Sequence, residues 1–142
     1  MKFHTLICFL VFIFQIIPAQ GQSICKFDTT VFNFGDIPEG SNAEARFKVT
    51  NISKQPIVIN QVISSGGGAF GSWSKKNINP GKTSYVTIKY DTRSRPGPIN
   101  RTNTVLISGG KTTERIPLRI IGRVVNRPAT DSINRAKAKT DE

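Results

Sequence analysis

Apolar and polar residues alternate along three segments of the chain, residues 42–51, 84–91 and 114–124. In the first segment Phe47 and Val49 share one face with two alanines, while charged residues and Thr50 occupy the other. A period of two is that of an extended chain with one buried face, so each segment predicts a half-buried β-strand. No stretch of the sequence has a convincing helical period.

Weaker strand patterns fill the intervals, and turn-forming residues separate them. The weaker segments are 30–37, 56–63, 68–74 and 99–107. The turn signals are Glu39-Gly40, Asn51-Ile52-Ser53, Pro80-Gly81, Pro96-Gly97 and Gly109-Gly110. Short strands at this spacing predict an all-β fold, a single immunoglobulin-like β-sandwich of about seven antiparallel strands over residues 22–125.

The two ends of the chain differ from this domain. Residues 1–21 join Lys2 to the apolar run Thr5–Ile17 and a small-residue segment, which is the pattern of a secretory signal peptide. The run is shorter than the about 20 residues that span a bilayer, although a retained anchor is the alternative. Residues 126–142 are polar and without aromatics, and predict a disordered tail. We expect an exported protein, periplasmic, at the cell surface or extracellular, that does not span the membrane once the signal is cleaved.

Removal of the signal peptide changes the chemistry available to the protein. His4 is the only histidine, so the mature chain has no histidine base and no histidine for a zinc site. Cys8 is also lost, which leaves Cys25 as a lone free thiol; a lipid anchor there would need a small residue where Ile24 stands. The 20 basic residues less Lys2, against 9 acidic residues, leave a net charge of +10, which favours anionic partners.

Two glycine-containing motifs test for nucleotide and anion binding. Gly81-Lys82-Thr83 ends like a phosphate-binding loop, but Lys76 stands where the first glycine of that motif belongs, and a strand pattern follows instead of a helix. Pro80-Gly81 suits the centre of a type II turn, so we expect no nucleotide site. Gly66–Gly68 could form an anion-binding nest, although a flexible inter-strand loop is the favoured interpretation.

Residues 31–125 resemble a known bacterial family. The motifs are F-x-F-G-x-I-x-x-G at Phe32–Gly40, T-N at Thr50-Asn51, P-G-K at Pro80–Lys82 and R-P-G-P at Arg95–Pro98. They are similar to those of the DUF1573 family of domains of unknown function. The resemblance implies a sandwich like the major sperm protein and ciliary ASH domains, export by Bacteroidetes-type bacteria and no enzymatic role. Ser65 and Gly67 stand where the family usually has two cysteines, so no redox, metal or disulfide role is carried over.

The residue inventory of the predicted domain does not suggest an enzyme. Its carboxylates are Asp28, Asp36, Glu39, Glu44, Asp91 and Glu114. A glycosidase needs two facing carboxylates, whereas several of these stand at turns or strand ends. Serines without a histidine lack the base of a triad, and a Ser-Lys pair cannot be recognised from spacing. We therefore predict no catalytic, cofactor-binding or metal-binding residues; a small hydrolase is the third alternative.

Arg115, Arg119 and Arg123 are the candidate partner-binding residues. They share the outward phase of segment 114–124 at steps of about 13 Å. Pro117 cannot donate to a ladder and suggests an edge strand, where charges discourage aggregation. The other interpretation is a cationic track for acidic glycans or an acidic protein. We expect a non-catalytic exported module for protein binding or structural assembly in the bacterial envelope, or alternatively for binding acidic glycans or lipopolysaccharide. Neither nucleotides nor specific nucleic acids are expected as partners.

Overall fold

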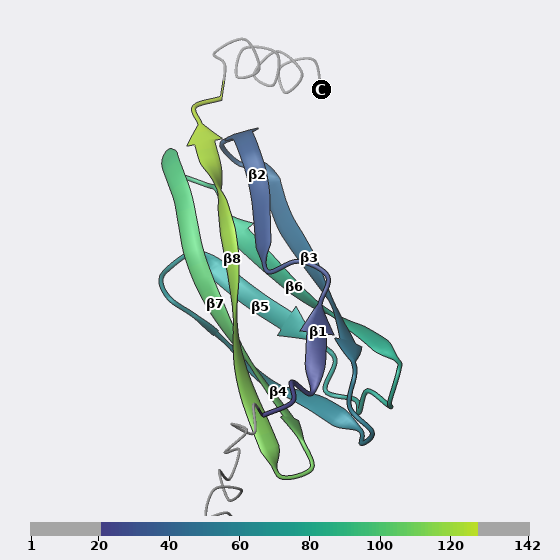
Figure 1. Cartoon of the computed structure of the whole chain (residues 1–142). Coiled ribbons are helices and arrows are strands. Elements are labelled where there is room, and N and C mark those ends of the chain that lie inside the picture. The colour runs from purple at the N-terminus through teal and green to yellow at the C-terminus, as the bar shows by residue number, and fades with distance from the viewer. Residues whose placement is uncertain (1–20, 128–142) are drawn as a thin grey trace, which may run out of the picture.

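Two four-stranded β-sheets packed face to face make up the part of the chain that the structure, a computed structural model, describes, residues 21–127 (Figure 1). The strands are β1 (Cys25–Phe27), β2 (Val31–Pro38), β3 (Asn42–Asn51), β4 (Ile57–Ser64), β5 (Ala69–Trp73), β6 (Thr83–Asp91), β7 (Gly97–Gly109) and β8 (Thr112–Val125). The predicted all-β sandwich is confirmed. Residues 21–127 contain no helix that is long and apolar enough to cross a membrane.

The strands form two sheets, each of which we name after one of its inner strands. The β3 sheet has the order β1-β3-β6-β5, and the β8 sheet has the order β2-β8-β7-β4. All neighbouring strands are antiparallel except β2 and β8, which run parallel. Eight strands are therefore present where about seven were expected, because three-residue β1 is too short to display a period in sequence.

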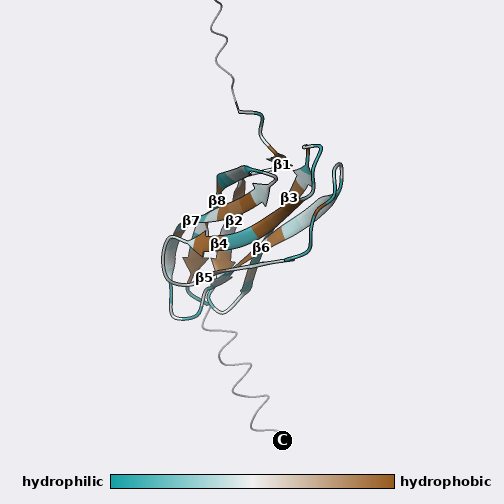
Figure 2. Cartoon of the chain, turned by 90° about the horizontal axis from the view of Figure 1, so that it is seen from below, coloured by the Kyte–Doolittle hydropathy of each residue, from teal (hydrophilic) through white to brown (hydrophobic). Residues whose placement is uncertain are grey.

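The core forms from the alternating positions that the sequence displays. Along β3, Ala43, Ala45, Phe47 and Val49 are all buried, and the register with β6 runs without a break. Phe47 is fully buried and meets the ring of Phe32 edge-on, with centroids 6.4 Å apart, so it links β3 to β2 across the sandwich. Figure 2 shows hydrophobic residues along the strands of both sheets and hydrophilic residues in the loops at their ends.

Two turns show why Asn51 and Gly81 stand at positions that the sequence pattern predicted to be turns. Asn51 is fully buried, and its side-chain amide donates to the carbonyls of Gln55 and Ile78, each at 2.8 Å, while its oxygen accepts the amide of Ser53. These bonds satisfy backbone groups that the turn leaves unpaired. In the other turn, Lys82 donates its backbone N–H to the carbonyl of Asn79 at 3.0 Å, and Gly81 has the positive φ of 74° that a type II turn requires. β6 follows directly, so the phosphate-loop geometry is absent there.

The parallel pair β2 and β8 contains a bulge. The pairing of Asn33 with Ile121 and of Asp36 with Arg123 places two residues of β2 opposite one of β8. Gly35 has a φ of 65° inside the bulge, and a Cβ on Gly122 would lie 2.8 Å from the carbonyl oxygen of Gly35. Only glycine at position 122 lets the two backbones approach this closely.

The first described residues are bonded to β8. The carboxylate of Glu114 accepts the backbone N–H of Ile24 at 2.7 Å and the hydroxyl of Ser23 at 3.0 Å. Cys25 is a buried free thiol beside the same carboxylate. Ile24 and Cys25 both belong to the hydrophobic core. The predicted signal peptide, up to residue 20, and the predicted tail from residue 128 lie outside the described residues.

Pro117 marks an edge only along part of β8. The expectation of an edge strand is wrong for Arg119–Val125, because β2 covers that half of β8 on one side and β7 covers the other. The backbone N–H of Arg119 bonds to the carbonyl of Thr30, at the start of β2. Alternate residues of a strand direct their backbone groups to the same side, so the ring nitrogen of Pro117 faces the open side of β8 just before the start of β2.

Candidate functional site

The three candidate arginines lie exposed on the outer face of the β8 sheet. The uninterrupted register of β7 and β8 places Arg115 opposite Leu106, Arg119 opposite Thr102 and Arg123 opposite Pro98. Because directly opposed residues project from the same face, outward side chains of β7 lie beside the guanidinium groups. We call this surface the arginine face and define it by Arg115, Arg119, Arg123 and the outward residues of β2, β7 and β4 opposite them.

Apolar side chains alternate with the arginines on this face. Val31 of β2, opposite Arg119, is 47% exposed, and Ile63 of β4, opposite Thr104, is 45% exposed. Leu106 and Ile121 are half-buried on the same face. The outer surface thus carries guanidinium groups together with single exposed aliphatic side chains on its two edge strands, and arginine is enriched in protein interfaces.

The arginines of this face have no acidic partner among the described residues. The ion pairs in that part of the chain join Lys48 to Asp28, Lys89 to Glu44 and Arg93 to Asp91. Arg119 directs its Nε to the side-chain oxygen of Asn100 at 2.9 Å, which orients the guanidinium without neutralising it. Asp36 of β2 lies opposite Arg123 on this face without forming an ion pair with it, so the arginine face keeps a net positive charge.

Most carboxylates of the predicted domain form ion pairs or hydrogen bonds with other parts of the structure. Three form the ion pairs just described, Glu114 binds the first residues, and Glu39 accepts the backbone N–H of Ser94 at 2.6 Å. Asp36 lies in the bulge of β2 opposite Arg123. Within residues 21–127 no three histidine, cysteine, aspartate or glutamate side chains gather as metal ligands would.

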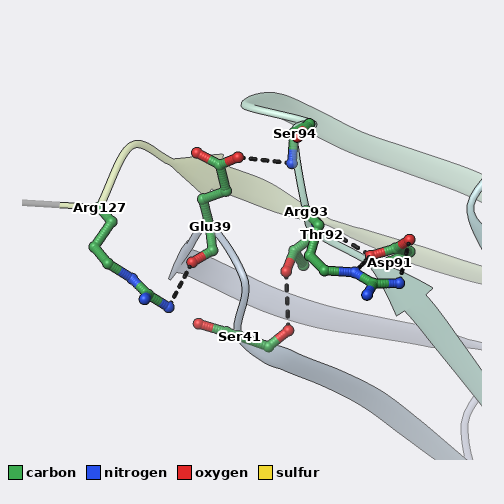
Figure 3. Close-up of polar contacts among 7 residues, drawn as sticks. All are labelled: Glu39, Ser41, Asp91, Thr92, Arg93, Ser94 and Arg127. Carbon is green, nitrogen blue, oxygen red and sulfur yellow. Dashed lines mark hydrogen bonds and ion pairs between the residues drawn. The ribbon is translucent and has the colours of Figure 1, made fainter. Parts of the chain in front are cut away.

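At one end of the sandwich the loop between β6 and β7 is fastened to the turn between β2 and β3 (Figure 3). Glu39 holds Ser94, which has the unusual φ of 53°, and Arg127 donates to the carbonyl of Glu39 at 3.0 Å. Thr92 donates its hydroxyl to the carbonyl of Ser41 at 2.9 Å. These bonds fix a loop that carries two further arginines. Ser94 keeps its strained positive φ because the carboxylate of Glu39 binds its N–H, whereas a glycine would adopt this φ without strain.

The arginines of this loop are differently placed from those on β8. Arg93 forms two hydrogen bonds with the carboxylate of Asp91, at 2.9 Å and 3.1 Å, and these bonds hold the pKa of Asp91 below its ordinary value of 3.8. Sequence reasoning missed Arg93, Arg95 and Arg127, because loop residues show no period. The available signal was the basic run T-R-S-R-P-G just before β7.

The opposite end of the sandwich contains an open hollow of about 1060 Å³. Its walls are the first described residues, the loop after β3 and the β7–β8 hairpin, including Ile52, Lys54 and Lys111. The hydroxyl groups of Ser23, Ser53 and Thr112 also line the hollow, and none of its lining residues is a histidine or a carboxylate.

Comparison with known proteins places the chain by family and by fold. The sequence profile described as "Protein of unknown function (DUF1573)" matches residues 25–124, most of the chain. No curated protein matches the sequence significantly.

Solved structures with the same fold come from proteins with different roles. The Vibrio cholerae VesB protease aligns with a TM-score of 0.62 at 18% identity, over 72% of this chain and 32% of the protease. PapD-like domain 7 of human CEP192, an ASH domain, aligns at 0.60 and 10% identity over 74% of this chain and 87% of that domain. The Pseudomonas aeruginosa CupB2 chaperone aligns at 0.51 and 15% identity, over 69% of this chain and 56% of the chaperone. This chain spans about a third of the protease, and identities this low establish the sandwich fold alone.

Proposed function

Because the chain belongs to the DUF1573 family of proteins of unknown function, we propose its role from its surface: a non-catalytic, exported module of the bacterial cell envelope that binds an acidic protein surface through the arginine face. The observation that carries the proposal is the set of unpaired arginines, Arg115, Arg119 and Arg123, interleaved with exposed apolar side chains on one sheet. Export rests on the apolar run of residues 5–17.

The chemistry of this face suits a protein partner. A guanidinium group donates in a planar fork that matches a carboxylate, and it is weakly hydrated, so it can be desolvated in an interface. The neighbouring Val31 and Ile63 offer apolar area that would be buried together with the arginines.

The fold neighbours are compatible with a binding module. One is a chaperone and another is an ASH domain, and neither is named as an enzyme. The protease aligns over less than a third of its own length, so we infer no protease activity for this chain from that similarity.

An acidic glycan is the second candidate for the same face. The arginines repeat every fourth residue along one uninterrupted pair of strands, which gives a straight row with steps of about 13 Å. A polymer with regularly spaced carboxylates or phosphates could follow such a row. In that case Val31 and Ile63 would contribute little to binding, because no apolar partner surface would cover them.

The experiment replaces Arg115, Arg119 and Arg123 together by Gln and measures binding to the envelope fraction of the source bacterium by co-sedimentation. We expect binding to weaken by at least tenfold, since three charge-assisted contacts are lost. The control replaces Lys26, Lys75 and Lys76 by Gln, which removes the same charge from exposed positions off the arginine face, and it should bind like the wild type.

Treatment of the envelope fraction separates the two candidates. Loss of binding after protease digestion, with binding kept after periodate oxidation of glycans, supports the protein partner; the reverse result supports the glycan. Equal weakening in the arginine and lysine triple variants would mean that net charge alone drives retention, and would refute a dedicated face. Circular dichroism of each variant verifies that it is folded.

A further inference from the structure

The glycine-rich loop between β4 and β5 is packed against two arginines. The Nε of Arg101 lies 3.6 Å from the point that a Cβ on Gly66 would occupy, and the Nε of Arg95 lies 3.3 Å from the corresponding point on Gly68. Gly68 has a φ of 89°, and its carbonyl accepts the backbone N–H of Asp91, which fixes the end of the loop. Two cationic groups thus border a loop of three glycines.

A buried amide lies beside this loop on the inner face of β7. Asn103 is fully buried, and its side-chain oxygen accepts the hydroxyl of Ser64 at 2.6 Å, but its Nδ2 has no hydrogen-bond partner among the described residues. Arg101 precedes it by two residues and therefore projects from the same face of the strand. The Nε of Arg101 is also buried without a partner, while its Nη1 donates to the carbonyl of Asn100.

Arg101 and Asn103 present two unpaired donors on one face of β7, and the positive charge of Arg101 favours an anionic acceptor. A buried donor without a partner costs about 1–3 kcal/mol, and more when the group is charged. A water molecule can accept from both donors but leaves the guanidinium charge uncompensated. An oxyanion carries two or more oxygens, so it can accept from each donor with a different oxygen and also neutralise the charge.

The carboxylates of the described residues do not supply that charge. No ion pair joins Arg101 to any of them, and the carboxylate that pairs in this loop region, Asp91, is bonded by the guanidinium of Arg93. The loop that borders the donors is accessible, because Ser65, Gly66 and Gly67 are exposed. Ser65 donates its backbone N–H to the carbonyl of Thr102 and accepts the N–H of Thr102 at its hydroxyl, so an anion would approach Arg101 from the exposed side at Gly66 and Gly67.

We propose that Arg101 and Asn103, beneath the loop Ser64–Gly68, form a binding site for one small oxyanion, a carboxylate or a phosphate. Arg101 supplies the charge, Asn103 supplies a second donor, and Arg95 adds positive potential at the glycines. The site lies on the inner face of β7, whereas the arginine face lies on the outer surface, so either proposal can fail without the other.

The test follows the side-chain amide signal of Asn103 by nuclear magnetic resonance during titration of the mature protein with sodium acetate and, separately, sodium phosphate. Ionic strength is kept constant with sodium chloride. A shift that saturates, together with a rise of several degrees in melting temperature, is expected for the anion that the site takes. The comparison of the two salts shows whether a carboxylate or a phosphate is preferred. A linear, unsaturated shift in both salts would overturn the proposal.

Three variants decide whether the response belongs to this site. Arg101→Gln should abolish both the saturation and the anion-dependent rise in melting temperature. Asn103→Asp places a carboxylate beside Arg101 and should make stability independent of added anion. Arg119→Gln, on the arginine face, should respond like the wild type. Equal rises in melting temperature in all four proteins would show a general salt effect on stability and would refute the site.

Discussion

At the scale of single residues, Cys25 is protected rather than reactive. Burial, followed by the charge and hydrogen bond of Glu114, raises the pKa of its thiol from 9.0 to about 12. A thiolate is the reactive form of cysteine, and it is disfavoured here both by burial and by a neighbouring negative charge. The lone thiol therefore contributes to packing, as a small apolar side chain does.

The raised pKa of Cys25 predicts a loss of stability at alkaline pH. The unfolded chain releases this proton near pH 9 while the folded chain keeps it to about pH 12, so the stabilising contribution is complete below pH 9 and declines as pH rises above it. The loss should approach about 1.4 kcal/mol per pH unit above 9. Urea unfolding of the wild type and of Cys25→Ala at pH 7 to 10.5 measures it. The difference in stability between the two proteins should narrow over pH 9 to 10.5; parallel curves would contradict the assignment.

At the scale of elements, the pairing of β2 with β8 depends on one glycine. A Cβ on Gly122 would press against the carbonyl oxygen of Gly35, and the φ of Gly122, 150°, disfavours other residues. The bulge in β2 exists at this point, so the two strands can neither separate nor slide without losing their register. The last strand thus receives its second partner through a close backbone contact.

Gly122→Ala should destabilise the protein by about 1–3 kcal/mol, because the added methyl group forces apart two backbones and strains φ. Gly67→Ala is the matched control: the nearest atom to its Cβ would be an Arg95 nitrogen at 4.0 Å, and its φ is not in the left-handed region. Thermal and urea denaturation of both variants give the comparison. If Gly122→Ala proved as stable as Gly67→Ala, β2 and β8 would have to separate easily at this bulge.

At the scale of the whole molecule, the two sheets share one core and are bonded across it. The only tryptophan, Trp73 of β5 in the β3 sheet, donates its indole N–H to the carbonyl of Ile59 in β4 of the β8 sheet at 2.9 Å. The β8 sheet also joins strands from both ends of the domain, β2 and β8. Neither sheet buries its inner face without the other.

Unfolding should therefore be a single cooperative transition. Trp73 fluorescence reports the contact between the sheets, and far-UV circular dichroism reports the strands, so the two urea curves should have the same midpoint. A fluorescence midpoint well below that of circular dichroism would show that the sheets separate before the strands unfold. The variant Trp73→Phe, which keeps an aromatic ring but loses the hydrogen bond to Ile59 and the fluorescence probe, should unfold in a single circular-dichroism transition with a lower midpoint.

Much of this fold could be predicted from local patterns. The boundaries expected for 42–51 agree with β3, and its inward residues are those that are buried, because alternation reports directly which face a strand hides. Pro80-Gly81 and Asn51 were recognised as turn residues for the same local reason. The three β8 arginines were expected to point outward, and they do; their role in binding stays a prediction.

Other features required the tertiary structure, since they depend on contacts between distant segments. Pro117 predicted an edge along the whole last strand, but β2 from the start of the domain pairs beside Arg119–Val125 and leaves only the first half of β8 open. Likewise the unpaired donors of Arg101 and Asn103 become visible only when the inner face of β7 is placed beside the loop after β4.

The sequence by itself determined seven of the eight strands, the buried faces of the alternating ones, the turns and the excess of positive charge, because each follows from neighbouring residues. The tertiary structure alone decided which strands pair, which carboxylates neutralise which cations, and which donors are buried without a partner. The arginines illustrate the difference: Arg93 and Arg119 look alike in sequence, yet Asp91 neutralises Arg93, while Arg119 has only the uncharged Asn100. Charge compensation depends on distance in space, and a single sequence does not specify that distance.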